Sequence, residues 1–152
     1  MVTTSSEQVA EKFFIFVDLI PPLNYLITPD GPTRNRLAVQ RDGIYRITYN
    51  VNVSNPDPAP GLVFTVITYI NDIRYIPASP TTFNGSILQS INLIDSFLVP
   101  IIKNNPTDQF SYITMSVFTE TPTSPNNNTI VGRATVNIER ISDIPPISVS
   151  LF

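Results

Sequence analysis

One stretch, residues 43–53, constrains the fold of this chain more than any other. It runs Gly-Ile-Tyr-Arg-Ile-Thr-Tyr-Asn-Val-Asn-Val, and its apolar and polar side chains alternate almost without error. Successive residues of a β-strand point to opposite faces of a sheet. The alternation therefore predicts a long strand with one face in a core and one polar face. The expected core face carries Tyr45, Ile47, Tyr49, Val51 and Val53, and the other face carries Arg46, Thr48, Asn50 and Asn52.

The rest of the chain repeats this theme between turn signals. Residues 62–70 are apolar on both parities, which predicts a strand covered on both faces. Asn71-Asp72 follows and predicts a two-residue hairpin turn into the next strand. Further strand-like runs are 13–17, 36–40, 73–76, 86–94, 97–102, 110–118 and 129–141, and the expected loops or turns are 28–32, 55–61, 104–108 and 119–128. Short strands at this spacing, with 15 prolines and no helical pattern, predict an all-β antiparallel jelly-roll sandwich of about eight or nine strands.

The 152 residues suit a single domain. We expect residues 1–11 to be a flexible N-terminal arm, 12–142 the sandwich domain, and 143–152 a C-terminal tail. Residues 1–7 have neither a basic region nor an apolar region, so no signal peptide is visible.

The composition excludes several classes of function. There is no cysteine and no histidine, so the chain lacks disulfides, thiolate sites, and the commonest general base and metal ligand. Only 14% of the residues are charged and the net charge is −3, which gives no footprint for nucleic acid. The longest apolar stretch, 62–70, is far shorter than the ~20 residues of a membrane-spanning helix. We therefore expect neither a nucleic-acid nor a membrane partner.

No reactive centre stands out. A nucleophile would need Lys12, Lys103 or a carboxylate as its base, and the aspartates lie singly at strand ends and turns, where they cap backbone N–H groups. Calcium ligands are conceivable among Asp57, Asp108 and residues 104–105, but no stretch has the dense acidic spacing of a calcium loop. We expect no catalytic residue, no cofactor and no metal.

Aromatic residues are the remaining candidates. Tyrosine and phenylalanine at strand positions serve a core or a subunit interface more often than a sugar-binding platform. The candidates for a subunit interface are Phe13, Phe14, Phe16, Tyr45, Tyr49, Phe64, Tyr69, Tyr112 and Phe152.

The two ends suggest a route to assembly. Residues 147–152 alternate like a strand, and residues 1–11 form a polar arm before the apolar run 13–17. A terminal strand can add to the sheet edge of another copy, and head-to-tail addition of this kind builds filaments. The alternative is that 13–17 is the first strand of its own sandwich and the tail is frayed.

Three segments together carry a family resemblance: Asp-Gly-Ile-Tyr-Arg-Ile-Thr-Tyr at 42–49, Asn-Asn-Pro-Thr-Asp at 104–108, and Gly-Arg-Ala-Thr-Val-Asn-Ile-Glu-Arg-Ile-Ser at 132–142. The chain resembles, over roughly residues 35–142, the jelly-roll proteins of bacterial spore surfaces. These are the exosporium basal-layer protein, the C-terminal heads of collagen-like exosporium glycoproteins, and endospore appendage subunits, all similar to the tumour-necrosis-factor and complement globular-head superfold. The chain departs from them in lacking a Gly-X-Y region, in the extra residues 119–128, and in the tail after Ser142.

The resemblance implies a non-enzymatic structural subunit that forms a homotrimer and assembles into a spore-surface layer or appendage fibre. Its partners would be copies of itself and other spore-surface proteins. Members of this family reach the spore surface from the mother-cell cytoplasm, which fits the lack of a visible signal peptide. The alternative is a receptor- or carbohydrate-binding head, although Phe83 is the only aromatic residue in the segments 55–61, 77–85 and 119–128.

Overall fold

A computed structural model describes residues 11–16, 27–30, 35–56, 61–75, 81–83, 90–121 and 128–145. All regular structure in these parts is β-strand, and every strand pair is antiparallel. The predicted all-β antiparallel class is confirmed. The strands are β1 (Glu11–Phe13), β2 (Ile27–Asp30), β3 (Arg36–Val39), β4 (Gly43–Ser54), β5 (Leu62–Ile70), β6 (Ile73–Tyr75), β7 (Thr81–Phe83), β8 (Ile91–Ile101), β9 (Ser111–Glu120) and β10 (Ile130–Ser142).

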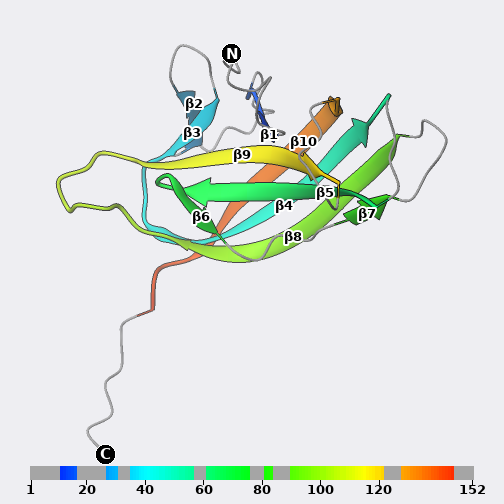
Figure 1. Ribbon diagram of the computed structural model, residues 1–152. Coiled ribbons are helices and arrows are strands. Elements are labelled where there is room, and N and C mark those ends of the chain that lie inside the picture. The colour runs from blue at the N-terminus through cyan, green and yellow to red at the C-terminus, as the bar shows by residue number, and fades with distance from the viewer. Residues whose placement is uncertain are drawn as a thin grey trace, which may run out of the picture.

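The strands form two sheets that face each other (Figure 1). The larger sheet has the order β2-β3-β9-β5-β6, with β1 also pairing with β9 and β7 with β5. The smaller sheet has the order β10-β4-β8. The chain crosses from one sheet to the other between β3 and β4, β4 and β5, β7 and β8, β8 and β9, and β9 and β10. This alternation is compatible with a jelly roll.

The core lies between the sheets and follows the alternation in β4. The five residues predicted to face inward are at most 3% exposed, which confirms the predicted strand and its core face. The larger sheet supplies the opposing layer from alternate positions of β5 and β9. Its fully buried side chains there are Leu62, Phe64, Val66, Ile113, Met115 and Val117. Each layer turns its apolar side chains away from water, which is the main favourable term in folding.

The predictions for β5 and its turn are confirmed. Leu62, Phe64 and Val66 face the core, and Thr65 and Ile67, on the other face of the strand, are also buried. Asn71 and Asp72 have φ of 49° and 66°, and Ile70 pairs with Ile73 across the turn. Positive φ at both central residues is the geometry of a tight hairpin whose twist matches its strands.

Strand β8 differs from the prediction. The sequence suggests two short strands, 86–94 and 97–102, because Asp95-Ser96 interrupts the apolar pattern. Residues 91–101 instead form one strand that pairs with β4 along its whole length, from Ile91 opposite Val53 to Ile101 opposite Gly43. Uninterrupted hydrogen bonding to the long strand β4 therefore keeps residues 91–101 extended across Asp95 and Ser96. Residues 86–89 lie outside the described part.

Strand β2 also corrects the prediction, which placed a loop at 28–32. Residues 27–30 pair with β3, and Pro29 lies opposite Leu37. β2 ends the strand order of the larger sheet, and an edge position tolerates a proline because one side of the strand needs no N–H donor.

The N-terminal strand is shorter and earlier than the run 13–17. β1 ends at Phe13; the amide of Phe14 donates to the carbonyl of Met115 at 2.8 Å, and residues 14–16 have no regular structure. Glu11 pairs with Phe118, so the sheet begins one residue before the predicted boundary of the arm. Residues 1–10, Val17 and the tail from 146 to 152 lie outside the described part.

Candidate functional site

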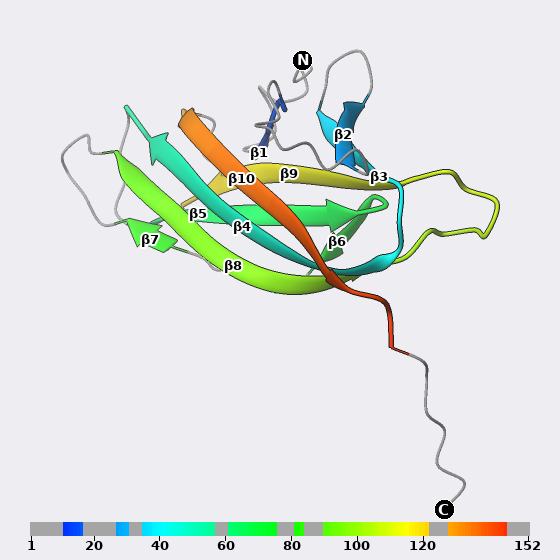
Figure 2. The same cartoon turned by 180° about the vertical axis from the view of Figure 1, so that it is seen from behind.

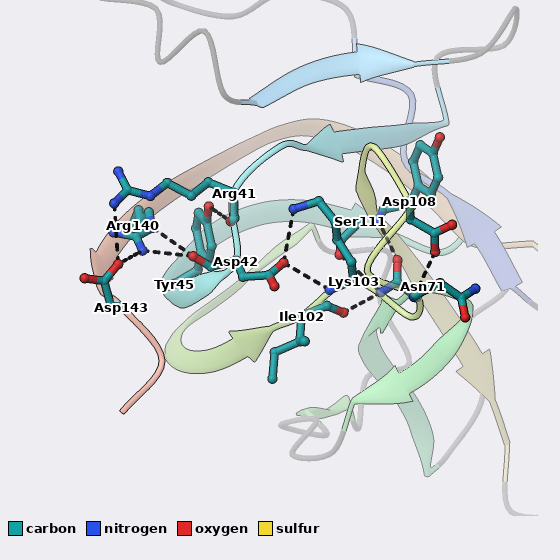
Figure 3. Close-up of polar contacts among 12 residues, drawn as sticks. Arg41, Asp42, Tyr45, Asn71, Ile102, Lys103, Asp108, Ser111, Arg140 and Asp143 are labelled. Carbon is teal, nitrogen blue, oxygen red and sulfur yellow. Dashed lines mark hydrogen bonds and ion pairs between the residues drawn. The ribbon is translucent and has the colours of Figure 1, made fainter. Parts of the chain in front are cut away.

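A cluster of hydrogen bonds ties the loops together at one end of the sandwich (Figure 3). Tyr45 donates its hydroxyl to the carbonyl oxygen of Arg41. Arg140 donates from Nε and Nη2 to the carbonyl oxygen of Asp42, at 3.2 and 2.9 Å. The Asp42 carboxylate accepts from the amide of Lys103 at 3.0 Å and from its Nζ at 3.3 Å. Lys103, one of the candidate bases considered from the sequence, is therefore held in an ion pair with Asp42 that joins two loops.

Gly43 makes the close packing of this cluster possible. A Cβ at this position would lie 2.6 Å from Nε of Arg140 and 2.7 Å from the carbonyl oxygen of Ser142. Such distances are too short for any side chain, so glycine is required for β10 to approach the start of β4. Asp143 then pairs with Arg140 and lies 3.5 Å from Nη2 of Arg41, and these guanidinium groups hold the pKa of its carboxyl below the ordinary value.

The hairpin turn is bonded into the same end (Figure 3). Oδ1 of Asn71 accepts from the amide of Tyr112 at 2.8 Å. Nδ2 of Asn71 donates to the carbonyl of Ile102 at 3.1 Å and to Oγ of Ser111 at 3.3 Å. Its own amide donates to the carbonyl of Tyr112 at 2.8 Å. One asparagine thus fixes the β5–β6 turn against the loop between β8 and β9.

The predicted turn at 104–108 is confirmed. The amide of Asp108 donates to the carbonyl of Asn105 at 3.0 Å, and the carboxylate of Asp108 accepts from the amide of Asn105 at 3.1 Å. Two of the oxygen-bearing residues considered for calcium therefore cap one another. Within the described residues there is no group of three or more carboxylate, histidine or cysteine side chains that could hold a metal. Asp57 lies outside that part of the chain.

Three buried polar side chains join the loops at the opposite end. Asn55 donates from Nδ2 to Oγ1 of Thr129 at 3.2 Å, and Thr129 donates to Oγ1 of Thr119 at 2.6 Å. None is more than 2% exposed. A buried hydroxyl left without a partner is costly, so this row holds the ends of β4 and β9 to the start of β10.

The side chain of Glu11, on the outer face of the larger sheet, ties β1 to β5 and β9. Its Oε1 accepts from the hydroxyl of Tyr69 and from Oγ of Ser116, both at 2.6 Å. The rings of Phe13 and Tyr69 lie 6.1 Å apart. Burial, followed by the hydrogen bond and charge of Glu11, raises the pKa of Tyr69 to about 12.

Four of the aromatic residues predicted at a subunit interface lie in the protein's own core. Phe14, Tyr45, Tyr49 and Phe64 are each at most 5% exposed. Their side chains are covered within one copy, so they offer no surface to a second copy, and the prediction is corrected to a core role at these positions. Burial, with the charge of Asp95, raises the pKa of Tyr49 to about 12.

The other predicted interface residues that the structure describes are half-buried. Phe13 lies against the ring of Tyr69, Phe16 packs against the core cluster, and Tyr112 has the guanidinium of Arg36 3.9 Å above its ring. Phe152 lies outside the described part. Phe13 lies opposite Ser116 and Tyr69 opposite Thr114, on the side of β9 that also carries Tyr112, so these three residues share the outer face of the larger sheet.

The outer face of the smaller sheet carries apolar side chains that the sequence analysis did not single out. Ile94 is 65% exposed and Leu98 is 51% exposed, and both lie on the face of β8 that points away from the core. Between them, Oγ of Ser96 is 2.8 Å from Oγ1 of Thr48 on β4. The signal was present, because Leu93-Ile94 and Phe97-Leu98 place apolar residues on both parities of this strand.

Strand β10 forms one edge of the smaller sheet (Figure 2). It is 13 residues long, and of the strands that the structure describes, β4 alone pairs with it. Ile130 and Ile141 near its ends are 54% and 42% exposed. The outer side of β10 therefore presents main-chain groups that a further strand could bind.

Comparison with models of protein families and with curated proteins gave no match to this chain. In the residues that the structure describes, no helix is long and apolar enough to cross a membrane. The fold and surfaces define an antiparallel β-sandwich whose smaller sheet has an open edge at β10 and an exposed apolar row on β8, on the other side of β4.

Proposed function

We propose that this protein is a non-enzymatic structural subunit that self-associates and assembles into a bacterial spore-surface layer or appendage fibre. The observation that carries the proposal is the sheet β10-β4-β8. This sheet combines an edge strand open on one side with exposed Ile94 and Leu98 on its outer face. Another protein surface could cover both the open edge and these two side chains.

The exposed apolar side chains favour association with another protein surface. Covering a large aliphatic side chain stabilises a contact by up to about 1.5–3 kcal/mol, and proportionately less for side chains already half covered. Main-chain groups along an open edge add hydrogen bonds when a second strand pairs there. A subunit that makes several such contacts can associate with further copies and so assemble.

The polar clusters support a structural role. The side chains at both ends of the sandwich bond to one another and to neighbouring backbone, as Asn71 does with three partners and Thr129 does with Asn55 and Thr119. This arrangement fixes loops. It is suited to a rigid building unit.

The resemblance to spore-surface jelly rolls indicates the oligomeric state and the location of the protein. It supports a homotrimer, partners among other spore-surface proteins, and a location on the spore surface. We assign the trimer contact to the β8 side of the outer face, where Ile94 and Leu98 are exposed.

The test compares oligomer mass by size exclusion with light scattering for the full chain and two variants. The double variant I94S/L98S removes the apolar row, and N50S changes a polar residue on the same face as a matched control. We expect wild type and N50S to be oligomeric, and I94S/L98S to shift toward a monomer that still unfolds in one cooperative urea transition. A wild-type monomer at micromolar concentration would contradict the proposal, and saturable binding by that monomer on a glycan array would favour the carbohydrate-binding alternative.

A further inference from the structure

We propose that β10 pairs with β10 of a second copy of this chain, antiparallel, about a two-fold axis through Val136. The proposal rests on the proposed function, since it names the partner and the register of one self-association contact. It concerns the edge of the smaller sheet and is separate from the apolar row on β8.

The middle of β10 is regular and is limited by an irregularity at each end. From Ala134 to Arg140 it pairs one-to-one with β4, and its register shifts between Val131 and Ala134 and again between Arg140 and Ser142. A β-bulge bends a strand and interrupts pairing. The one-to-one segment is therefore seven residues long, from Ala134 to Arg140, and its centre is Asn137, one residue from the proposed axis.

Residues 133–139 are complementary to themselves when reversed; they comprise six residues of the one-to-one segment and Arg133, the last residue of the irregularity before it. Pairing about Val136 sets Arg133 opposite Glu139 of the second copy, and the two-fold axis repeats the pair. Thr135 then lies opposite Asn137, and Ala134 lies opposite Ile138. Directly opposed residues of an antiparallel pair share a face, so charge meets opposite charge, polar meets polar, and apolar meets apolar.

Neighbouring registers lose this match. An axis through Thr135 would set Arg133 against Asn137 and Glu139 against Val131. An axis through Asn137 would set Arg133 against Ile141 and Glu139 against Thr135. Only the axis through Val136 opposes the two charges.

The burial of the strand fits a partner at this edge. Val136 and Ile138 pack against the core but are only half-buried, and Ala134 is exposed. In the pair these residues form a row with their counterparts and extend the core across the junction. Arg133 and Glu139 are exposed on the other face, where Oε2 of Glu139 is also 3.6 Å from Nη1 of Arg46.

The product is a continuous sheet in the order β8-β4-β10-β10-β4-β8. A two-fold contact of this kind is closed. It adds to the trimer contact on β8, and two different contacts on each subunit would link trimers into an extended layer.

Cysteine cross-linking tests the position of the axis. The chain has no cysteine, so a disulfide in the full-length V136C variant joins residue 136 to residue 136 of another copy. Directly opposed residues have Cα atoms about 4.5–5.5 Å apart, within the range that a disulfide spans. The control T48C lies on the neighbouring strand β4, where three strand spacings, about 14 Å, would separate the two cysteines. After mild oxidation we expect a reducible dimer band from V136C and a monomer band from T48C on denaturing gels.

Charge reversal tests the register. R133E or E139R alone places like charges opposite each other at both ends of the pair, and we expect the dimer to dissociate at about tenfold higher concentration. The double variant R133E/E139R restores opposite charges, and we expect it to recover most of the affinity in sedimentation experiments. The urea midpoint of each variant checks that loss of the contact with Arg46 has not unfolded the chain.

The outcomes separate the two proposals. If the chain self-associates but V136C does not cross-link, β10 pairing is overturned and the proposed function stands. If V136C cross-links but R133E/E139R fails to recover affinity, the register is overturned. If every variant and the wild type are monomeric, including the case in which another segment of the same chain covers β10, both proposals fall.

Discussion

Replacing Asn71 with alanine tests how the hairpin turn and the loop cluster are held together. The residue has φ of 49°, which is a left-handed conformation. Its side chain accepts from the amide of Tyr112 and donates to Ile102 and Ser111. Alanine removes all three bonds and disfavours the backbone conformation.

The expected loss follows from these parts. Alanine in the left-handed region costs about 1 kcal/mol more than asparagine, which tolerates it. The half-buried amide of Tyr112 loses its acceptor at about 1 kcal/mol, and the two donated bonds add about 0.5 kcal/mol each. N71A should therefore destabilise the protein by about 3 kcal/mol. N71D, which keeps the acceptor and tolerates the conformation, should cost about 1 kcal/mol.

Urea unfolding followed by circular dichroism measures these differences from the midpoints at a constant slope. Asp72 provides a matched control, because it has φ of 66° in the same turn with an exposed side chain. D72A should lose only the backbone part, about 1 kcal/mol. If N71A and D72A are equally stable, the side-chain bonds of Asn71 do not hold this end together and the reasoning is wrong.

Two further predictions concern the core and alkaline stability. I47A should destabilise the protein by about 2–5 kcal/mol, since Ile47 is fully buried, whereas T48A on the opposite face should cost under about 1 kcal/mol; equal urea midpoints would contradict the assignment of faces. The pKa values of Tyr49 and Tyr69 are raised to about 12 from an ordinary 10, so the folded state holds these protons more tightly than the unfolded state does. The stability that results is complete below pH 10 and is lost as the pH rises from 10 to 12. In Y49F this loss of stability should be shallower, and absorbance at 295 nm should show late ionisation of these two tyrosines in the folded protein; if all tyrosines ionise near pH 10 while the fold persists, the burial argument fails.

Local patterns predicted much of the fold. The alternation in β4 and β10 and the Asn71-Asp72 turn are local features, and the structure has them within a residue of the expected bounds. Strand β2 was missed because Pro29 lies within it and Asp30-Gly31-Pro32 signals a turn, although its partner β3 follows closely in the sequence. The continuity of β8 was missed because it depends on pairing with β4, which lies far away in the sequence. Pairing over such distances leaves little trace in a single segment.

The candidate interface was harder to predict for a physical reason. An aromatic residue in a core and one at an interface have the same hydrophobic signature, and Tyr45 and Phe64 proved to be core. The open side of β10 depends on which strand pairs with it, so its sequence alone could not show that it is an edge. Once β10 is known to be an edge strand, the self-complementary run from Arg133 to Glu139 can be interpreted as a segment that pairs with a second copy.

A cryo-electron microscopy map of the assembled protein would show whether copies of this chain contact one another through the sheet β10-β4-β8. We expect neighbouring copies that meet at the outer face of β8 and at the free side of β10. A map of isolated single subunits, or of an assembly in which this sheet is turned toward solvent on every copy, would contradict it.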